Sequence, residues 1–115
     1  MSYSVETTKE FENRIKKLAK KYKNIKKDFE KLLNDFESGN FIGDAIKGFK
    51  NKVFKIRMRS SNMQKGKRGG FRIIYHLEIK QKRIILLTIY AKVQKKDIKP
   101  KEIKAILKNL GLNAM

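Results

Sequence analysis

Two runs of alternating apolar and charged residues, joined by a glycine-rich turn, restrict the possible fold of this chain more than any other feature. In residues 53–59 and again in residues 71–80, an apolar side chain stands at nearly every second position. Because successive side chains of a strand point to opposite faces, this period predicts two strands that each have one apolar face. Residues 66–70 between them read Gly-Lys-Arg-Gly-Gly, which predicts the turn of a β-hairpin. Such a hairpin would place five basic side chains on a single cationic face of the sheet, namely Lys55, Arg57, Arg59, Arg72 and His76.

Amphipathic helices are predicted on both sides of this hairpin. Apolar residues at three- and four-residue spacings indicate a first helix that follows an N-cap at Thr7 or Thr8. The same spacing indicates a second helix over residues 25–37, which Gly39 would stop. A last helix is predicted over residues 100–111, because its first residue is a proline and proline is favoured in the first helical turn.

Three further segments complete the order of elements. Tyr3-Ser4-Val5 predicts a short first strand, and residues 41–50 predict a connecting loop. Residues 83–91 are apolar on both faces, which is typical of a strand covered on both sides. The order strand, helix, helix, strand, strand, strand, helix predicts one α+β domain over residues 1–115. In this domain, a two-helix hairpin and a C-terminal helix would pack on a mainly antiparallel four-stranded sheet.

The charge of the chain indicates a polyanionic partner. Thirty lysines and arginines stand against eleven acidic residues, for a net charge of +19, while 40% of the residues are hydrophobic and favour a folded domain. A compact chain with this charge repels itself, and bound nucleic acid would relieve the repulsion. A general drift of surface positions to lysine explains part of the helix charge, but it does not explain arginines on strands.

The residue types and segments that the sequence lacks limit its chemistry and indicate its compartment. Without cysteine, the chain has no disulfides, thiolate metal sites or cysteine nucleophile. No cluster of histidine, aspartate and glutamate has the spacing of a metal site, so we expect no metal and no cofactor. Because no signal peptide or membrane-spanning run is visible, we expect a cytoplasmic protein.

Three segments together resemble the RelE/ParE toxin superfamily, and most closely its HigB-like branch. Nearly the whole chain follows that superfamily in its order of elements, but the specific part lies between residues 54 and 97. The segments that carry the resemblance are Phe54-Lys55-Ile56-Arg57-Met58-Arg59, Gly66-Lys67-Arg68-Gly69-Gly70-Phe71-Arg72-Ile73-Ile74-Tyr75 and Leu86-Leu87-Thr88-Ile89-Tyr90-Ala91-Lys92. Lys55 and Arg57 match the paired cations of the family's second strand, and Arg72 matches the arginine that opens its third. After Lys92 this chain lacks the further arginine and the late tyrosine of the RelE pattern.

The resemblance implies the toxin of a type II toxin-antitoxin system. RelE-like members are ribosome-dependent messenger RNA endonucleases, and an antitoxin encoded by the adjacent gene keeps them silent. The implied partners are therefore the ribosome, messenger RNA and an antitoxin of the helix-turn-helix type, with the toxin monomeric outside that complex and no membrane involved. Two alternatives remain open: a ParE-like inhibitor of DNA gyrase, and a basic nucleic-acid-binding module without catalysis.

RNA cleavage without a metal needs a base for the 2′-hydroxyl, an acid for the leaving 5′-oxygen, and cations for the phosphorane. Arg72 is the candidate that grips the scissile phosphate, because a guanidinium can bind two oxygens at once. Lys55 and Arg57 could stabilise charge, or the lysine could transfer a proton. Each of these cations could also be an ordinary surface residue that supports the hairpin.

Aromatic and turn residues supply the remaining candidates. His76 has a side chain suited to acid or base work near neutral pH, although a structural histidine is the commoner case. Tyr90 and Lys92 could reach the same surface, where Tyr90 could stack on a base or donate a proton, or could belong to the core with its hydroxyl outward. The candidates for contacts to the RNA backbone are Arg59, Lys65, Lys67 and Arg68.

Overall fold

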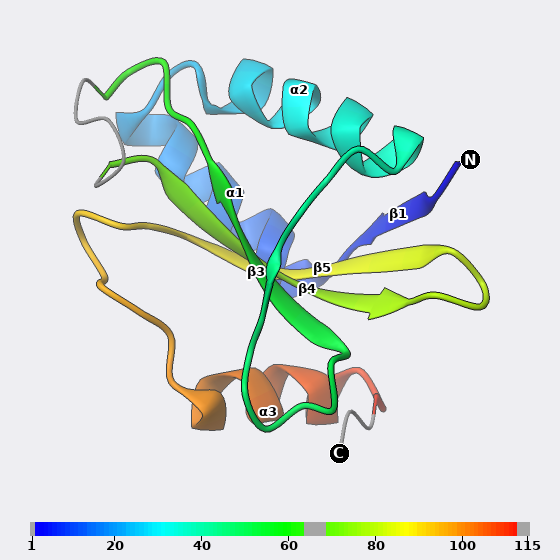
Figure 1. The fold of residues 1–115 in the computed structure, drawn as a ribbon. Helices are drawn as coiled ribbons and strands as arrows, with labels where there is room; N and C mark the ends of the chain where they lie inside the picture. Colours follow the sequence, from blue (N-terminus) through cyan, green and yellow to red (C-terminus); the bar gives the residue numbers. More distant parts are fainter. Residues whose placement is uncertain (1, 64–68, 113–115) are drawn as a thin grey trace.

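A five-stranded sheet with helices on both faces forms this protein (Figure 1). The computed structural model describes residues 2–63 and 69–112. The elements in chain order are β1 (Ser4–Thr7), α1 (Lys9–Lys21), α2 (Ile25–Ser38), β2 (Asp44–Ala45), β3 (Val53–Met58), β4 (Phe71–Glu78), β5 (Arg83–Ala91) and α3 (Pro100–Asn109). The strands lie side by side in the order β1-β5-β4-β3-β2, with β1 parallel to β5 and the other neighbours antiparallel.

The predicted α+β architecture is confirmed, but the predicted four-stranded sheet is wrong in detail. The fifth strand, β2, lies within the segment predicted to be a loop and pairs Asp44 with Lys55 and Ala45 with Phe54. Aspartate and alanine are rare in strands, so the sequence of β2 carries no strand signal. The chain extends there because the outer edge of β3 offers unpaired backbone groups, and the N–H of Ile46 also donates to the carbonyl of Val53 over 2.9 Å.

Two separate cores lie on the two faces of the sheet. On one face, α1 and α2 pack Phe11 and Phe36 against a set that includes Ile73 and Leu86. On the other face, α3 packs Ile103 and Leu107 against the second set of strand residues, which are Val53, Ile74, Ile85, Leu87 and Tyr90. Strand β5 is thus covered on both sides, which confirms the prediction made from its apolar run.

A bulge in β5 changes which side chains face α3. Ile74 of β4 pairs with Thr88, whereas the next residue of β4, Tyr75, pairs with Leu86, so Leu87 is an extra residue in β5. An extra residue reverses the alternation of side chains beyond it. Tyr90 therefore lies on the α3 face with Ile85 and Leu87, although regular alternation would put it on the opposite face.

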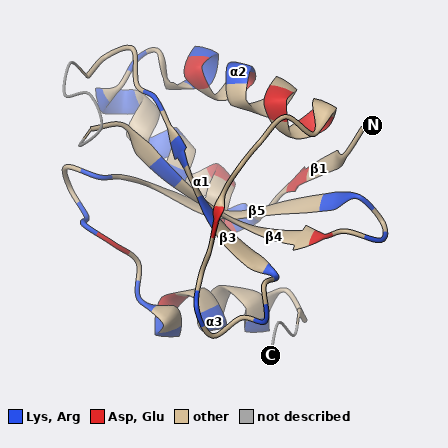
Figure 2. Cartoon of the chain, in the orientation of Figure 1, with Lys and Arg blue, Asp and Glu red and all other residues tan. Residues whose placement is uncertain are grey.

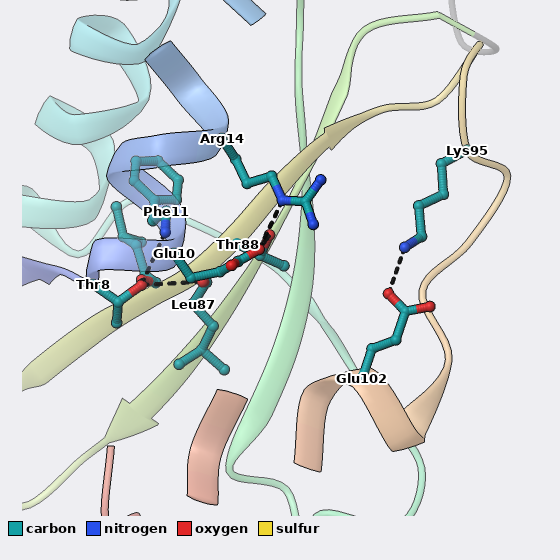
Figure 3. A network of polar contacts seen from close by, with 9 residues as sticks. Thr8, Glu10, Phe11, Arg14, Leu87, Thr88, Lys95 and Glu102 are labelled. Carbon is teal, nitrogen blue, oxygen red and sulfur yellow. Dashed lines mark hydrogen bonds and ion pairs between the residues drawn. The ribbon is translucent and has the colours of Figure 1, made fainter. Parts of the chain in front are cut away.

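Thr8 is the N-cap of α1 and also contacts the bulge in β5 (Figure 3). Its hydroxyl accepts from the N–H of Phe11 over 3.1 Å, which confirms Thr8 rather than Thr7 as the N-cap. The same hydroxyl lies 2.9 Å from the carbonyl oxygen of Leu86 and 3.1 Å from that of Leu87. The start of α1 is thereby tied to the irregular part of β5.

Candidate active site

A row of three polar residues crosses the sheet from β3 to β5. Arg57 lies directly opposite Arg72, and Arg72 lies opposite Tyr90. Directly opposed residues of antiparallel strands have Cβ atoms about 4.5–5.5 Å apart, and like charges at that separation destabilise a sheet. An anion bound between two opposed guanidinium groups would reduce the repulsion between them.

Lys55 brings a third cation to this face, two residues before Arg57 on β3. Its Nζ lies 3.4 Å from Oδ1 of Asp97, a residue of the loop between β5 and α3. The hydroxyl of Tyr90 donates to the same carboxylate oxygen over 3.4 Å. One oxygen of Asp97 thus connects Lys55 of β3 with Tyr90 of β5.

Tyr90 is a hydrogen-bond donor at neutral pH. Burial raises the pKa of Tyr90 to about 12, with the Asp97 carboxylate acting in the same direction and the Arg72 guanidinium against it. The side chain is 8% exposed, which leaves little ring surface for stacking on a base. The hydroxyl, not the ring face, is therefore the part of Tyr90 that could contact a ligand, and it already contacts Asp97.

Asp97 is the residue that sequence reasoning missed. Burial alone would raise the pKa of Asp97, but the N–H of Ile98, the Lys55 ammonium and the Tyr90 hydroxyl outweigh it and hold that pKa below its ordinary value. The carboxylate is therefore charged at neutral pH. One signal was available, since Asp97 is the only acidic residue between positions 79 and 101 of a very basic chain.

Backbone carbonyls at the end of the hairpin orient Arg72. Its Nη1 donates to the carbonyl oxygens of Gly69 and Phe71, both over 3.2 Å. The carbonyl of Gly70 in turn accepts from the N–H of Lys92 over 3.1 Å. The ammonium of Lys92 donates to the carbonyl of Lys96 in the loop before α3. Lys92 therefore supports the loop that carries Asp97.

His76 lies apart from the row. It shares the sheet face of Arg72, as its phase predicts, but four residues along a strand correspond to about 13 Å. Its neighbours in the ladder are Val53 and Ile85, both in the core under α3, and it is 7% exposed. This position gives His76 no access to a phosphate held by the arginines, so we leave it out of the proposed chemistry.

The burial of His76 makes stability depend on pH. Burial lowers the pKa of His76 from its ordinary 6.5, and Lys52 and Arg83 add to this effect while Glu78 opposes it. The unfolded chain therefore binds a proton more readily, so stability is full above pH 6.5 and falls as the pH drops from there toward the folded pKa. We expect urea unfolding of the wild-type chain to show this loss as the pH falls from 6.5 to about 5.5, which is about one unit above the ordinary glutamate pKa of 4.5. A His76→Phe variant should show a flatter profile, and an equally steep one would assign the loss to other groups.

The candidates for RNA-backbone contacts are only partly within the described residues. Arg59 is exposed just after β3 and lines a shallow hollow together with Arg57, Met63 and Gly70. Lys65, Lys67 and Arg68, together with most of the predicted turn, lie outside the described residues. Arg59 therefore extends the cationic surface from Arg57 toward the turn.

Lysines and arginines are also frequent in the rest of the chain (Figure 2). They occur on the helices, on β3 and in the loops, so charge alone does not mark the site. In residues 2–63 and 69–112, no group of three or more histidine, aspartate or glutamate side chains could hold a metal ion. Within the same residues, no helix is long and apolar enough to cross a membrane.

A known toxin shares this fold. No protein-family profile matches the chain. Among solved structures, the chain is similar to a mutant of the toxin RelE from E. coli in the free state, with a TM-score of 0.54 over 84% of this chain and 90% of that chain. The sequence identity is 19%, so the likeness establishes the fold and not the activity. The chain has a RelE-like toxin fold, as its sequence segments led us to expect.

Proposed function

We propose that this protein is the toxin of a type II toxin-antitoxin system, of the RelE and HigB kind, and that it cleaves messenger RNA on the ribosome without a metal ion. The opposed pair Arg57 and Arg72 is the observation that supports this proposal most. The pair brings two arginine side chains together on one face of the sheet, where both can bind oxygens of a single phosphate. The RelE-like fold and the net charge of +19 agree with an RNA substrate.

Each residue of the row has a role in the proposed cleavage. The 2′-hydroxyl of the RNA gives its proton to a solvent water and attacks the adjacent phosphorus. The bond from phosphorus to the 5′-oxygen breaks, which leaves a 2′,3′-cyclic phosphate and a 5′-hydroxyl. Arg72 and Arg57 bind the phosphate oxygens and stabilise the charge that develops on them, with Lys55 beside them. Tyr90 keeps its proton at neutral pH and donates it toward the leaving 5′-oxygen.

An antitoxin would have to neutralise this surface in the cell. The cationic row and the basic helices would be blocked by an acidic or amphipathic segment, supplied by a helix-turn-helix protein from the neighbouring gene. Coexpression of that protein should restore growth. The partner would be identified by copurification with the basic toxin.

The test of the proposed function is induced expression of the chain in bacteria. We expect growth arrest and new 5′ ends within translated messages, mapped by primer extension. The same message without a start codon should stay intact, because cleavage needs the ribosome. A Lys55→Ala variant should lose most of the effect, whereas Lys80→Ala, which removes an exposed cation outside the row, should keep it.

Other outcomes would select other functions. DNA breaks with intact messages would favour a gyrase inhibitor. Salt-sensitive RNA binding with no cleavage on ribosomes would favour a binding module. Equal cleavage of translated and untranslated messages would leave a ribonuclease but remove its dependence on the ribosome.

A further inference from the structure

Asp97 is an anion placed inside a site that is otherwise built for anions. The lysine, tyrosine and two arginines of this face can all bind phosphate oxygens, and a fixed carboxylate beside them would repel an RNA backbone. At 65% exposure the Asp97 side chain lies mostly in solvent, whereas that of Lys55 is 30% exposed. Both line a hollow beside β2, together with Lys47 and a second carboxylate, that of Asp44. RNA therefore meets the Asp97 carboxylate when it approaches Lys55.

The contacts of Asp97 are of two kinds. Its Oδ1 accepts from the N–H of Ile98 over 2.9 Å, which is an ordinary hydrogen bond. The distances from the same oxygen to Lys55 Nζ and Tyr90 Oη are both 3.4 Å, longer than a strong charge-assisted hydrogen bond. The contact with the N–H of Ile98 is therefore the strongest of the three, and the weaker contacts with Lys55 and Tyr90 can be exchanged for contacts with another anion.

We infer that the Asp97 carboxylate occupies, in the free protein, the position of an RNA phosphate, and that RNA must displace it from Lys55 and Tyr90. The inference rests on the proposed function, because it takes the ligand of this face to be a phosphodiester. Oδ1 of Asp97 then marks where a phosphate oxygen binds, between the ammonium of Lys55 and the hydroxyl of Tyr90. In this role Asp97 weakens RNA binding and does not help catalysis.

A simple positioning role predicts the opposite effect on binding. If Asp97 served to orient Lys55 and Tyr90, loss of its charge would release both groups and weaken the site. If Asp97 takes the place of the phosphate, loss of its charge frees both groups for the RNA. The sign of the change in RNA affinity therefore separates the two roles.

The experiment measures binding of a short single-stranded RNA with methylated 2′-oxygens, which cannot be cut, by fluorescence anisotropy at fixed salt. Asp97→Asn keeps an oxygen for the N–H of Ile98 and removes the charge. We expect it to bind about fivefold more tightly than wild type, the upper range for release of an exposed ion pair. Glu30→Gln, on the exposed side of α2, makes the same change in net charge away from the site and should give a much smaller gain.

The Lys55→Ala protein, used as a second background, tests the contact between Lys55 and Asp97. In Lys55→Ala protein, Asp97→Asn should gain no more than Glu30→Gln, because there is no lysine to release. An equal gain from Asp97→Asn and Glu30→Gln in the wild-type background would overturn the inference, and so would weaker binding or no measurable binding by Asp97→Asn. Failure of the proposed function would show separately, as intact translated messages in cells that express the wild-type protein.

Discussion

Replacing Arg72 with alanine is expected to slow RNA cleavage about 100- to 1,000-fold, the usual cost of removing a group that binds a developing oxyanion. Arg72 stands at the centre of the row, opposite Arg57 on one side and Tyr90 on the other. Its guanidinium is oriented by the carbonyls of Gly69 and Phe71. The measurement is single-turnover cleavage of a message on programmed ribosomes.

The stability of the Arg72→Ala variant separates catalysis from folding. Arg72 faces a like charge but also donates to two backbone carbonyls, so its removal should change the free energy of unfolding by no more than about 1 kcal/mol in either direction. Arg72→Lys keeps the charge but cannot bind two oxygens at once, so its rate should lie between those of wild type and alanine. A folded variant that cleaves at the wild-type rate would contradict the role we propose for Arg72, and a variant that unfolds would assign the loss of cleavage to folding.

Local sequence patterns were enough to predict the strands that carry this site and the sheet face on which its cations lie. The alternation in residues 53–59 and 71–80 placed Lys55, Arg57 and Arg72 on one sheet face, and β3 and β4 pair as that prediction requires. The alternation of side chains along a strand is a property of the backbone, so it does not depend on which elements pack on the sheet. The helix boundaries were also predictable because Thr8 and Gly39 act through local hydrogen bonds and backbone conformation.

The parts that could not be predicted depend on contacts distant in sequence. Tyr90 reaches the row because Leu87 is an extra residue in β5, and the contacts that hold this bulge come from Thr8, 79 positions earlier. His76 is covered because residues from α3 pack on its face of the sheet. Asp97 joins the site through a loop whose course is set by side-chain contacts, one of which pairs Lys95 with Glu102 (Figure 3). No periodicity in the sequence encodes these contacts.

A second large effect is expected at Gly70, the last residue before β4. Its φ of +81° lies in the left-handed region, and a Cβ there would stand 2.6 Å from the carbonyl oxygen of Met58. Met58 pairs with Phe71, so the clash falls on the last rung of the β3–β4 ladder. We expect Gly70→Ala to lower the free energy of unfolding by about 2–5 kcal/mol, the sum of backbone strain and overpacking. Urea denaturation measures this change.

Gly48→Ala is the matched control, because Gly48 also has a positive φ, +96°, but no atom lies within 4 Å of its Cβ position. It should cost only the backbone strain, about 1–2 kcal/mol. The two variants should also differ in activity. To relieve the Gly70 clash, β3 and β4 must separate at the Met58–Phe71 pair, which is next to the Arg57–Arg72 pair. A shift of about 1 Å at a reacting group can lower the rate about 100-fold. Equal loss of stability and equal cleavage in both variants would mean that the close approach of Gly70 to β3 does not position the arginines.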